Sequence, residues 1–345
     1  MEISSPLLSW YDLNRRTLPW RGSHDPYLIW ISEIIFQQTR IEQGTGYYLR
    51  FVERFPTLVS LAAAGEDEVL WLWQGLGYYS RARNLLFTAR MIMDQGGEFP
   101  ADFGAILKLR GIGDYTASCI ASICFGQPHA AVDGNVYRVL SRLFADGIPI
   151  DGPTGKKHFK QLAQKLISTE RPGDFNEAMM DLGATVCKPR APLCTTCPLK
   201  NFCKSFDAGN PTDFPVKSPA MKRSGSVMNY LLFRSDDQVG IRKRSGNGIW
   251  KGLYELPMLP GELDPMGLIA ECRETYGIQV DRLTEIRRTR HILTHTELDI
   301  RFYAAESSHP DGQPENKLLM IPVNRITEYP FPKPLVDFLD SLGNE

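Results

Sequence analysis

Hydrophobic residues recur three and four positions apart through the first half of the chain. The spacing is clearest in residues 30–43, 81–93 and 157–167, where it predicts amphipathic helices. From residue 204 the period is lost, and the next twenty or so residues are rich in Pro, Gly, Ser and Lys. This composition is typical of an interdomain linker.

Beyond this stretch, short apolar or alternating runs replace the helical spacing. Three of them predict strands: 227–233, 238–244 and 298–305. Two further runs predict helices: 267–277 and 334–342. The pattern therefore divides the chain into an all-α domain at 1–204, a linker at 205–225 and an α+β domain at 226–345.

Length and composition agree with two globular domains. A chain of 345 residues is longer than a typical single domain, and 43% hydrophobic and 23% charged content is typical of a folded protein. Neither a membrane-spanning run nor a secretory start is visible, so we expect a cytoplasmic protein with no membrane partner. The net charge of -1 does not indicate a polyanion binder. Basic residues nevertheless gather before residue 205, and a near-zero net charge is compatible with a surface that is positively charged on one side.

Four of the seven cysteines fall within seventeen residues, with the spacing C-x6-C-x2-C-x5-C. They are Cys187, Cys194, Cys197 and Cys203. Thiolates without a clustered histidine require a soft metal, either zinc or an iron–sulfur cluster. Zinc ribbons usually present two C-x-x-C pairs, whereas this stretch has one, so the spacing favours iron–sulfur and leaves zinc as the alternative.

A Gly-Ile-Gly turn at Gly111 to Gly113 separates an apolar helix end from a helix that should begin near Asp114. Such a turn exposes backbone N–H groups that can hold a phosphate. A plain connection between helices is the alternative reading.

Two acidic residues lie next to apolar stretches of the sequence. Glu33 is surrounded by apolar residues, so its carboxyl either lies at a polar edge or has a raised pKa. Asp133 precedes an apolar helical run and is expected to cap it. Carboxyl groups in contrasting environments are what cleavage of a glycosidic bond requires. Spacing alone does not predict that these two meet.

The first two hundred residues resemble the helix-hairpin-helix DNA glycosylases of the endonuclease III superfamily, and most closely the MutY-type adenine DNA glycosylases. Seven stretches carry the resemblance: LPWR (18–21), SEIIFQQT (32–39), GLGYYSRARNL (75–85), LRGIGDYTA (109–117), VDGNVYRVLSR (132–142), FNEAMMDLGATVC (175–187) and the cysteine cluster. The resemblance implies an all-α helix-hairpin-helix glycosylase domain with a [4Fe–4S] cluster loop.

The resemblance also implies roles for single residues. Glu33 would protonate the adenine, and Asp133 would face the sugar C1′ atom. The remaining implied roles are orientation of that pair by Tyr115 and Asn135, contact with the flipped base by Arg21 and Glu177, contact with the DNA backbone by Gly111 and Gly113, and packing around a damaged guanine by Gln38, Thr39, Leu76 and Tyr78.

Tyr115 bears on the chemistry. Strand-cutting members of the superfamily are expected to carry a lysine at the matching position, because an amine can form a Schiff base with the opened sugar. Tyrosine cannot, so a monofunctional enzyme is expected.

Residues 246–257, GNGIWKGLYELP, resemble part of the Nudix-like domain with which MutY proteins read 8-oxoguanine. The Glu-Glu pair that a true Nudix hydrolase needs to bind Mg²⁺ is missing, so the domain is expected to recognise 8-oxoguanine and not to hydrolyse a pyrophosphate. Leu293, Thr294 and His295 replace the Phe-Ser-His of the family, and Thr294 keeps the hydroxyl. A buried core histidine is the alternative for His295.

The resulting expectation is an adenine DNA glycosylase of base excision repair. Its cofactor would be a [4Fe–4S] cluster, and its partner double-stranded DNA with A:8-oxoguanine or A:G mispairs. We expect a monomer, associated with the nucleoid if bacterial. The alternatives are a superfamily glycosylase for thymine, uracil or oxidised pyrimidines, and a non-catalytic lesion-binding protein.

Overall fold

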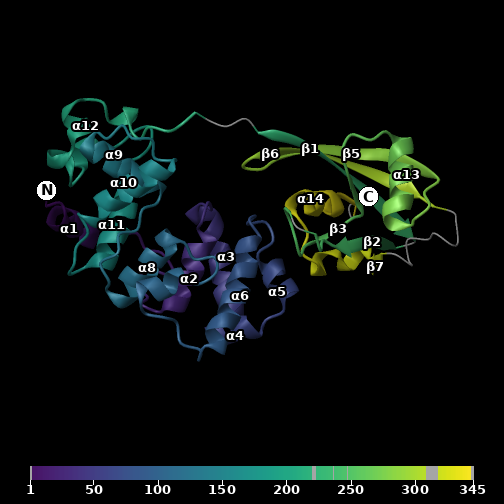
Figure 1. The fold of residues 1–345 in the computed structure, drawn as a ribbon, viewed down its shortest axis with the longest axis horizontal. Coiled ribbons are helices and arrows are strands. Elements are labelled where there is room, and N and C mark those ends of the chain that lie inside the picture. Colours follow the sequence, from purple (N-terminus) through teal and green to yellow (C-terminus); the bar gives the residue numbers. More distant parts are fainter. Residues whose placement is uncertain (1, 220–222, 236, 247, 308–317, 343–345) are drawn as a thin grey trace. The chain divides into compact units, whose positions relative to one another are not determined.

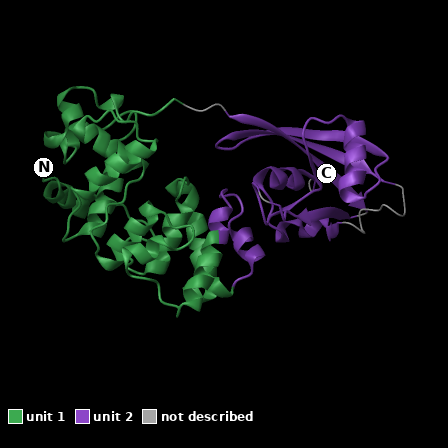
Figure 2. Cartoon of the chain, viewed as in Figure 1, with its two compact units in different colours: residues 1–63, 84–219 green, residues 64–83, 220–345 purple. Residues whose placement is uncertain are grey.

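The computed structural model describes residues 2–219, 223–235, 237–246, 248–307 and 318–342. The chain forms two compact units, coloured separately in Figure 2. The first comprises Met1–Ala63 and Asn84–Pro219, and the second comprises Ala64–Arg83 and Ala220–Glu345. No helix within the described ranges is long and apolar enough to cross a bilayer.

The first unit is helical, as the spacing of its apolar residues predicts (Figure 1). Proline occupies the first position of three of its helices, where its missing N–H costs no hydrogen bond. The helices are α1 (Ser4–Asn14), α2 (Pro26–Ile35), α3 (Ile41–Arg54), α4 (Leu58–Ala63), α7 (Phe103–Leu107), α8 (Asp114–Phe125), α9 (Gly134–Phe144), α10 (Pro153–Gln164), α11 (Pro172–Thr185) and α12 (Lys204–Asp207), with the short 3₁₀ turns η1 (Cys194–Thr196), η2 (Lys200–Phe202) and η3 (Pro211–Asp213).

The predicted helix over 30–43 is interrupted. α2 ends at Ile35, Gln38 adopts a φ of 58°, and α3 starts at Ile41. The Phe36 ring packs on Trp20, with 4.3 Å between ring centroids. Tertiary packing therefore stops a helix that the apolar spacing would have continued.

The second unit is built on a seven-stranded sheet with a path of β3-β2-β1-β6-β5, to which β4 and β7 add at β1 and β2. β1 and β6 run parallel and pair from Ser224↔Thr296 to Phe233↔Ala305. The strands are β1 (Ser224–Ser235), β2 (Gln238–Lys243), β3 (Tyr254–Glu255), β4 (Met258–Pro260), β5 (Arg282–Ile292), β6 (Thr296–Glu306) and β7 (Leu319–Pro322).

Helices complete the second unit. α13 (Pro265–Tyr276) buries Leu268 and Cys272 in the core of this unit. The Phe338 ring of α14 (Lys333–Leu342) stacks on Phe302 of β6, with 3.9 Å between centroids. α5 (Glu66–Leu72) and η6 (Val323–Glu328) also belong to this unit, and α6 (Ser80–Asp94) contributes residues to both. The predicted fold class, all-α followed by α+β, is confirmed.

Part of the stretch predicted as a linker is tied to the first unit. The Phe214 carbonyl accepts a hydrogen bond from Arg142 Nε at 3.1 Å, and the Val216 carbonyl accepts from Ile150 N at 3.1 Å. Composition reveals the absence of a helical period but not these backbone partners. The predicted boundaries of the two domains and the linker stay a prediction.

Candidate active site

Glu33 lies near the end of α2 between buried neighbours. Ser32 and Ile34 are each at most 3% exposed. Burial raises the pKa of the Glu33 carboxyl from 4.5 to about 7, while the Tyr115 hydroxyl and the Arg21 guanidinium oppose the rise. At neutral pH a substantial share of Glu33 is therefore protonated, which is the state that a general acid requires.

Asp133 caps α9, as predicted. Its Oδ1 atom accepts hydrogen bonds from Asn135 N at 2.9 Å and Val136 N at 2.8 Å, and its Oδ2 atom accepts from Asn135 Nδ2 at 2.8 Å. Burial raises the pKa of Asp133, and these hydrogen bonds oppose the rise. The N-terminus of a helix also favours negative charge. The cap is thus an environment that supports an ionised carboxylate.

Separate parts of the sequence supply this site. Arg21, Glu177 and Asp133 all act electrostatically on the Glu33 carboxyl, and Tyr115 lies beside it. Tyr115 donates its hydroxyl hydrogen to Met180 Sδ at 3.6 Å. The folded chain therefore brings the Asp133 charge near enough to help raise the pKa of Glu33, which spacing alone did not predict.

The hairpin between α7 and α8 needs its glycines. Gly111 has a φ of +82°, and a Cβ atom at this position would lie 2.7 Å from Asn84 Cβ. Gly113 caps α8 and, like Gly111, is exposed. The backbone N–H groups at the start of α8 are thus open to a phosphate.

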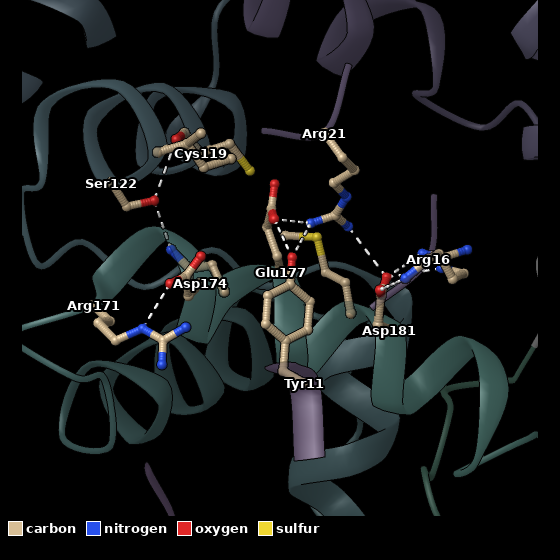
Figure 3. Close-up of polar contacts among 12 residues, drawn as sticks. Tyr11, Arg16, Arg21, Cys119, Ser122, Arg171, Asp174, Glu177 and Asp181 are labelled. Atoms are coloured by element: carbon tan, nitrogen blue, oxygen red, sulfur yellow. Dashed lines mark hydrogen bonds and ion pairs between the residues drawn. The ribbon is translucent and has the colours of Figure 1, made fainter. Parts of the chain in front are cut away.

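Arg21 and Glu177 form an ion pair between Nη1 and Oε2 (Figure 3). Tyr11 donates its hydroxyl hydrogen to the same Glu177 oxygen. The Arg21 Nε atom is buried and has no hydrogen-bond partner among the described residues. A buried donor without an acceptor is costly unless a ligand satisfies it, so Arg21 is a candidate contact for a bound group.

Gln38 and Thr39 lie in the turn after α2, not on a helix. Gln38 is exposed, and the Thr39 hydroxyl lies 3.5 Å from the Gln37 carbonyl oxygen. The positive φ of Gln38 marks a backbone held by its surroundings, which is common where a ligand is contacted.

In the second unit, two of the predicted recognition residues meet. The Tyr78 and Thr294 hydroxyls lie 2.6 Å apart, and both residues are exposed. His295 is also exposed, which contradicts its alternative reading as a core histidine. Leu76 is only 8% exposed. A pair of accessible hydroxyls is suited to hydrogen bonds with a base edge.

The four clustered cysteines line one small apolar cavity. In the part of the chain that the structure describes, no three His, Cys, Asp or Glu side chains converge closely enough to hold a single metal ion. Four thiols around one apolar space are the donor set of a soft metal group.

Sequence reasoning missed the residues that support these sites. Arg142 is 2% exposed and donates hydrogen bonds to the carbonyls of Lys188 at 2.7 Å and Pro189 at 2.8 Å. These hydrogen bonds attach the cysteine loop to α9. Asp181 is fully buried on α11. An acid within the apolar run of α11 is the same signal that singled out Glu33, and it could have been found.

The fold and this site are those of a class of DNA repair proteins. Residues 31–179 match the HhH-GPD superfamily of base excision DNA repair proteins, and residues 229–341 match the NUDIX domain. A thermostable thymine-DNA glycosylase is similar in structure, with a TM-score of 0.55, 31% identity and coverage of 59% of this chain and 95% of that one. An endonuclease III bound to DNA has a TM-score of 0.51 at 25% identity, covering 60% and 96%.

The curated relatives are more specific. The adenine DNA glycosylase of Buchnera aphidicola subsp. Baizongia pistaciae is 34% identical over 85% of this chain and 83% of its own length. The mouse adenine DNA glycosylase is 44% identical over 59% of this chain. The chain belongs to the adenine DNA glycosylase family. The match spans 41% of the mouse protein.

Proposed function

We propose that the protein is a monofunctional DNA glycosylase that removes adenine mispaired with 8-oxoguanine or guanine. The observation that carries the proposal is the contrast between two carboxyl groups. Burial raises the pKa of both carboxyl groups, that of Glu33 to about 7, but only Asp133 accepts three hydrogen bonds at a helix N-terminus that oppose the rise and favour its ionised form. Departure of a base needs one proton donor and one anion.

The reaction requires the adenine to leave the helical stack. Glu33 would then donate a proton to a ring nitrogen of the base, so that it departs neutral. Asp133 would stabilise the positive charge that develops at C1′, and water would complete the hydrolysis. Tyr115 and Asn135 would orient the two carboxyl groups, while Gly111 and Gly113 would bind the backbone phosphates.

The family match supports adenine as the target, and the side chain at position 115 supports the absence of strand cleavage. A lyase reaction needs an amine that attacks C1′. Tyr115 offers a hydroxyl whose pKa burial raises well above its ordinary value, so it is not a nucleophile at neutral pH.

The test is excision from duplexes that carry A opposite 8-oxoguanine, T opposite G, or an oxidised pyrimidine. We expect alkali-labile sites in the first duplex alone, and intact strands before alkali. Excision of thymine or of the pyrimidine would favour another glycosylase of the superfamily. Binding of the first duplex without alkali-labile sites would favour a lesion-binding protein.

The second unit would read the base opposite the adenine. Tyr78 and Thr294 support this role because their exposed hydroxyls lie 2.6 Å apart and can both donate and accept. His295 and Leu76 would flank the reading pair. Gln38 and Thr39, in the turn after α2 of the first unit, would also contact the DNA.

Thr294→Ala is expected to lower the preference for A:8-oxoguanine over A:G by about tenfold, since one hydrogen bond to a polar base edge is lost. Single-turnover rates on the two duplexes give the ratio. Thr284→Ala is the matched control, because Thr284 is an exposed threonine on β5 of the same unit. An unchanged ratio would remove Thr294 from the reading site.

The cysteine loop would hold a [4Fe–4S] cluster through Cys187, Cys194, Cys197 and Cys203. When bound, the cluster supplies iron–thiolate bonds that order the loop, and base hydrolysis consumes no electrons. Lys188, Arg190 and Lys200 are all exposed in this loop and would face phosphates. Bound iron with a broad visible absorption would support the assignment, whereas stoichiometric zinc would contradict it.

Cys197→Ser is expected to reduce bound iron, thermal stability and affinity for duplex DNA together, because the loop that carries the cationic side chains loses a ligand. Iron content, melting temperature and a binding titration measure the three. Cys124→Ser provides the control, since Cys124 lies outside the cluster. A folded, cluster-free variant with normal affinity would show that the loop does not serve DNA binding.

A further inference from the structure

The Arg21–Glu177 pair borders an open space. Both side chains line a cavity of about 560 Å³, and they are 12% and 11% exposed. Close packing holds a side chain in one rotamer only where atoms surround it. On the cavity side that restraint is missing, so hydrogen bonds must keep the pair in one arrangement.

Tyr11 supplies one of these restraints. It lies on α1 and is 3% exposed, and its hydroxyl donates to Glu177 Oε2 and accepts from Arg21 Nη1 at 3.3 Å. Burial and the Glu177 carboxylate raise the pKa of Tyr11, so it remains a donor. Figure 3 shows one dashed line from Tyr11 and one from Arg21 meeting at the same oxygen of Glu177, while the other oxygen is directed away from Tyr11. Among the described residues, that second oxygen, Oε1, makes no hydrogen bond.

Asp181 supplies the second restraint. It follows Glu177 by one turn of α11 and is fully buried. Its Oδ1 atom lies 3.2 Å from Arg21 Nη2 and accepts hydrogen bonds from Arg16 Nε at 2.8 Å and Nη2 at 2.6 Å. Its Oδ2 atom accepts from Arg16 N at 3.0 Å. Both terminal nitrogens of Arg21 are therefore engaged, and Nε is the buried donor left over.

We infer that Tyr11 and Asp181 are positioning residues that select the base through the two atoms of Glu177 and Arg21 that they leave unpaired. This inference rests on the proposed function. Glu177 Oε1 remains as an acceptor and Arg21 Nε as a donor. Adenine matches this pair, since it carries an amino donor at position 6 next to a ring-nitrogen acceptor. Hypoxanthine presents a carbonyl oxygen at position 6 and would set one acceptor against another.

The inference predicts a loss of discrimination and not only of rate. Without the Tyr11 hydroxyl, the Glu177 carboxylate can turn into the cavity, so the preference for a 6-amino base weakens. We expect Tyr11→Phe to lower the ratio of excision rates for adenine over hypoxanthine, and for adenine over unsubstituted purine, by about tenfold.

The experiment measures single-turnover excision of adenine, hypoxanthine and purine opposite 8-oxoguanine. Tyr27→Phe is the matched control, because Tyr27 is 5% exposed and its hydroxyl donates to the Phe55 carbonyl at 2.6 Å away from this group. Asp181→Asn should lower the same ratios, and Asp12→Asn is its control, since Asp12 pairs with Arg171 at an exposed position.

Lower ratios in Tyr11→Phe and Asp181→Asn, with both controls unchanged, would support the inference. If Tyr11→Phe slows all three bases by one common factor, Tyr11 only supports the fold, and the inference is overturned while the proposed function stands. If the wild-type protein excises no adenine, the proposed function fails and this inference fails with it. Should Asp181→Asn not fold, Tyr11→Phe alone decides the question.

Discussion

Replacing Glu33 by glutamine is expected to slow single-turnover excision of adenine by about 10³-fold, within the range that a general acid contributes. Glutamine keeps the shape of the side chain but has no acidic proton that it can transfer at neutral pH. Affinity for the duplex should change little, because the proton is needed only as the base departs. Excision under single-turnover conditions and a binding titration separate the two effects.

The wild-type rate should also depend on pH through this residue. Since burial raises the pKa of Glu33 to about 7, excision is expected to fall as the pH rises through 7. The folded state binds this proton more tightly than the unfolded chain, so the free energy of unfolding decreases between pH 4.5 and about 7. Glu33→Gln should lack that decrease and be the more stable protein at pH 8.

Glu53→Gln is the control for both measurements, because Glu53 is an exposed residue of α3 in the same unit. It should leave the rate, its pH dependence and the stability unchanged. Normal excision by Glu33→Gln would mean that the raised pKa is a cost of burial without a catalytic use.

Replacing Asp133 by asparagine is expected to slow excision by about 10²- to 10³-fold, as expected when a charge that stabilises the transition state is removed. Asparagine caps helices about as well as aspartate, so thermal stability should stay close to that of the wild type. The change thereby separates two functions of one side chain. A melting curve and a single-turnover rate report on them independently.

Asp102→Asn provides the matched control, because Asp102 caps α7 through a 3.0 Å hydrogen bond to Ala105 N. It should be neutral in both measurements. If Asp133→Asn excises adenine at the wild-type rate, Asp133 is a helix cap only, and another group must stabilise the sugar.

Local sequence patterns predicted much of the fold. The helical spacing of the first half, the start of α8 at Asp114 and the cap of α9 by Asp133 are properties of neighbouring residues. β5 was not predicted, because its residues are largely polar and its sequence has no regular alternation of apolar and polar positions. Its pairing with β6 along most of its length determines that it is a strand.

The candidate site was predicted unevenly. Glu33, Asp133 and Tyr115 were named from motifs. Only the folded chain shows that Asp133 and Tyr115 act on the carboxyl group of Glu33. Tyr11 carried no signal in the sequence, and Arg142 ended the stretch VDGNVYRVLSR without being assigned a role, since a tyrosine and an arginine in helices are ordinary. Their importance comes from hydrogen-bond partners far along the chain, at Glu177 and in the cysteine loop.

By itself, the sequence determined the helical and mixed halves, the spacing of four thiols and a glutamate in apolar surroundings. The periodicity of side chains and the conformational freedom of glycine act over a few residues, so they can be recognised in a string of letters. Only the tertiary structure decided that the Asp133 charge helps to raise the pKa of Glu33, and that Tyr11 and Asp181 leave one acceptor and one donor without a partner among the described residues. Burial and long-range hydrogen bonds produce these properties, and both exist only once distant segments have packed together.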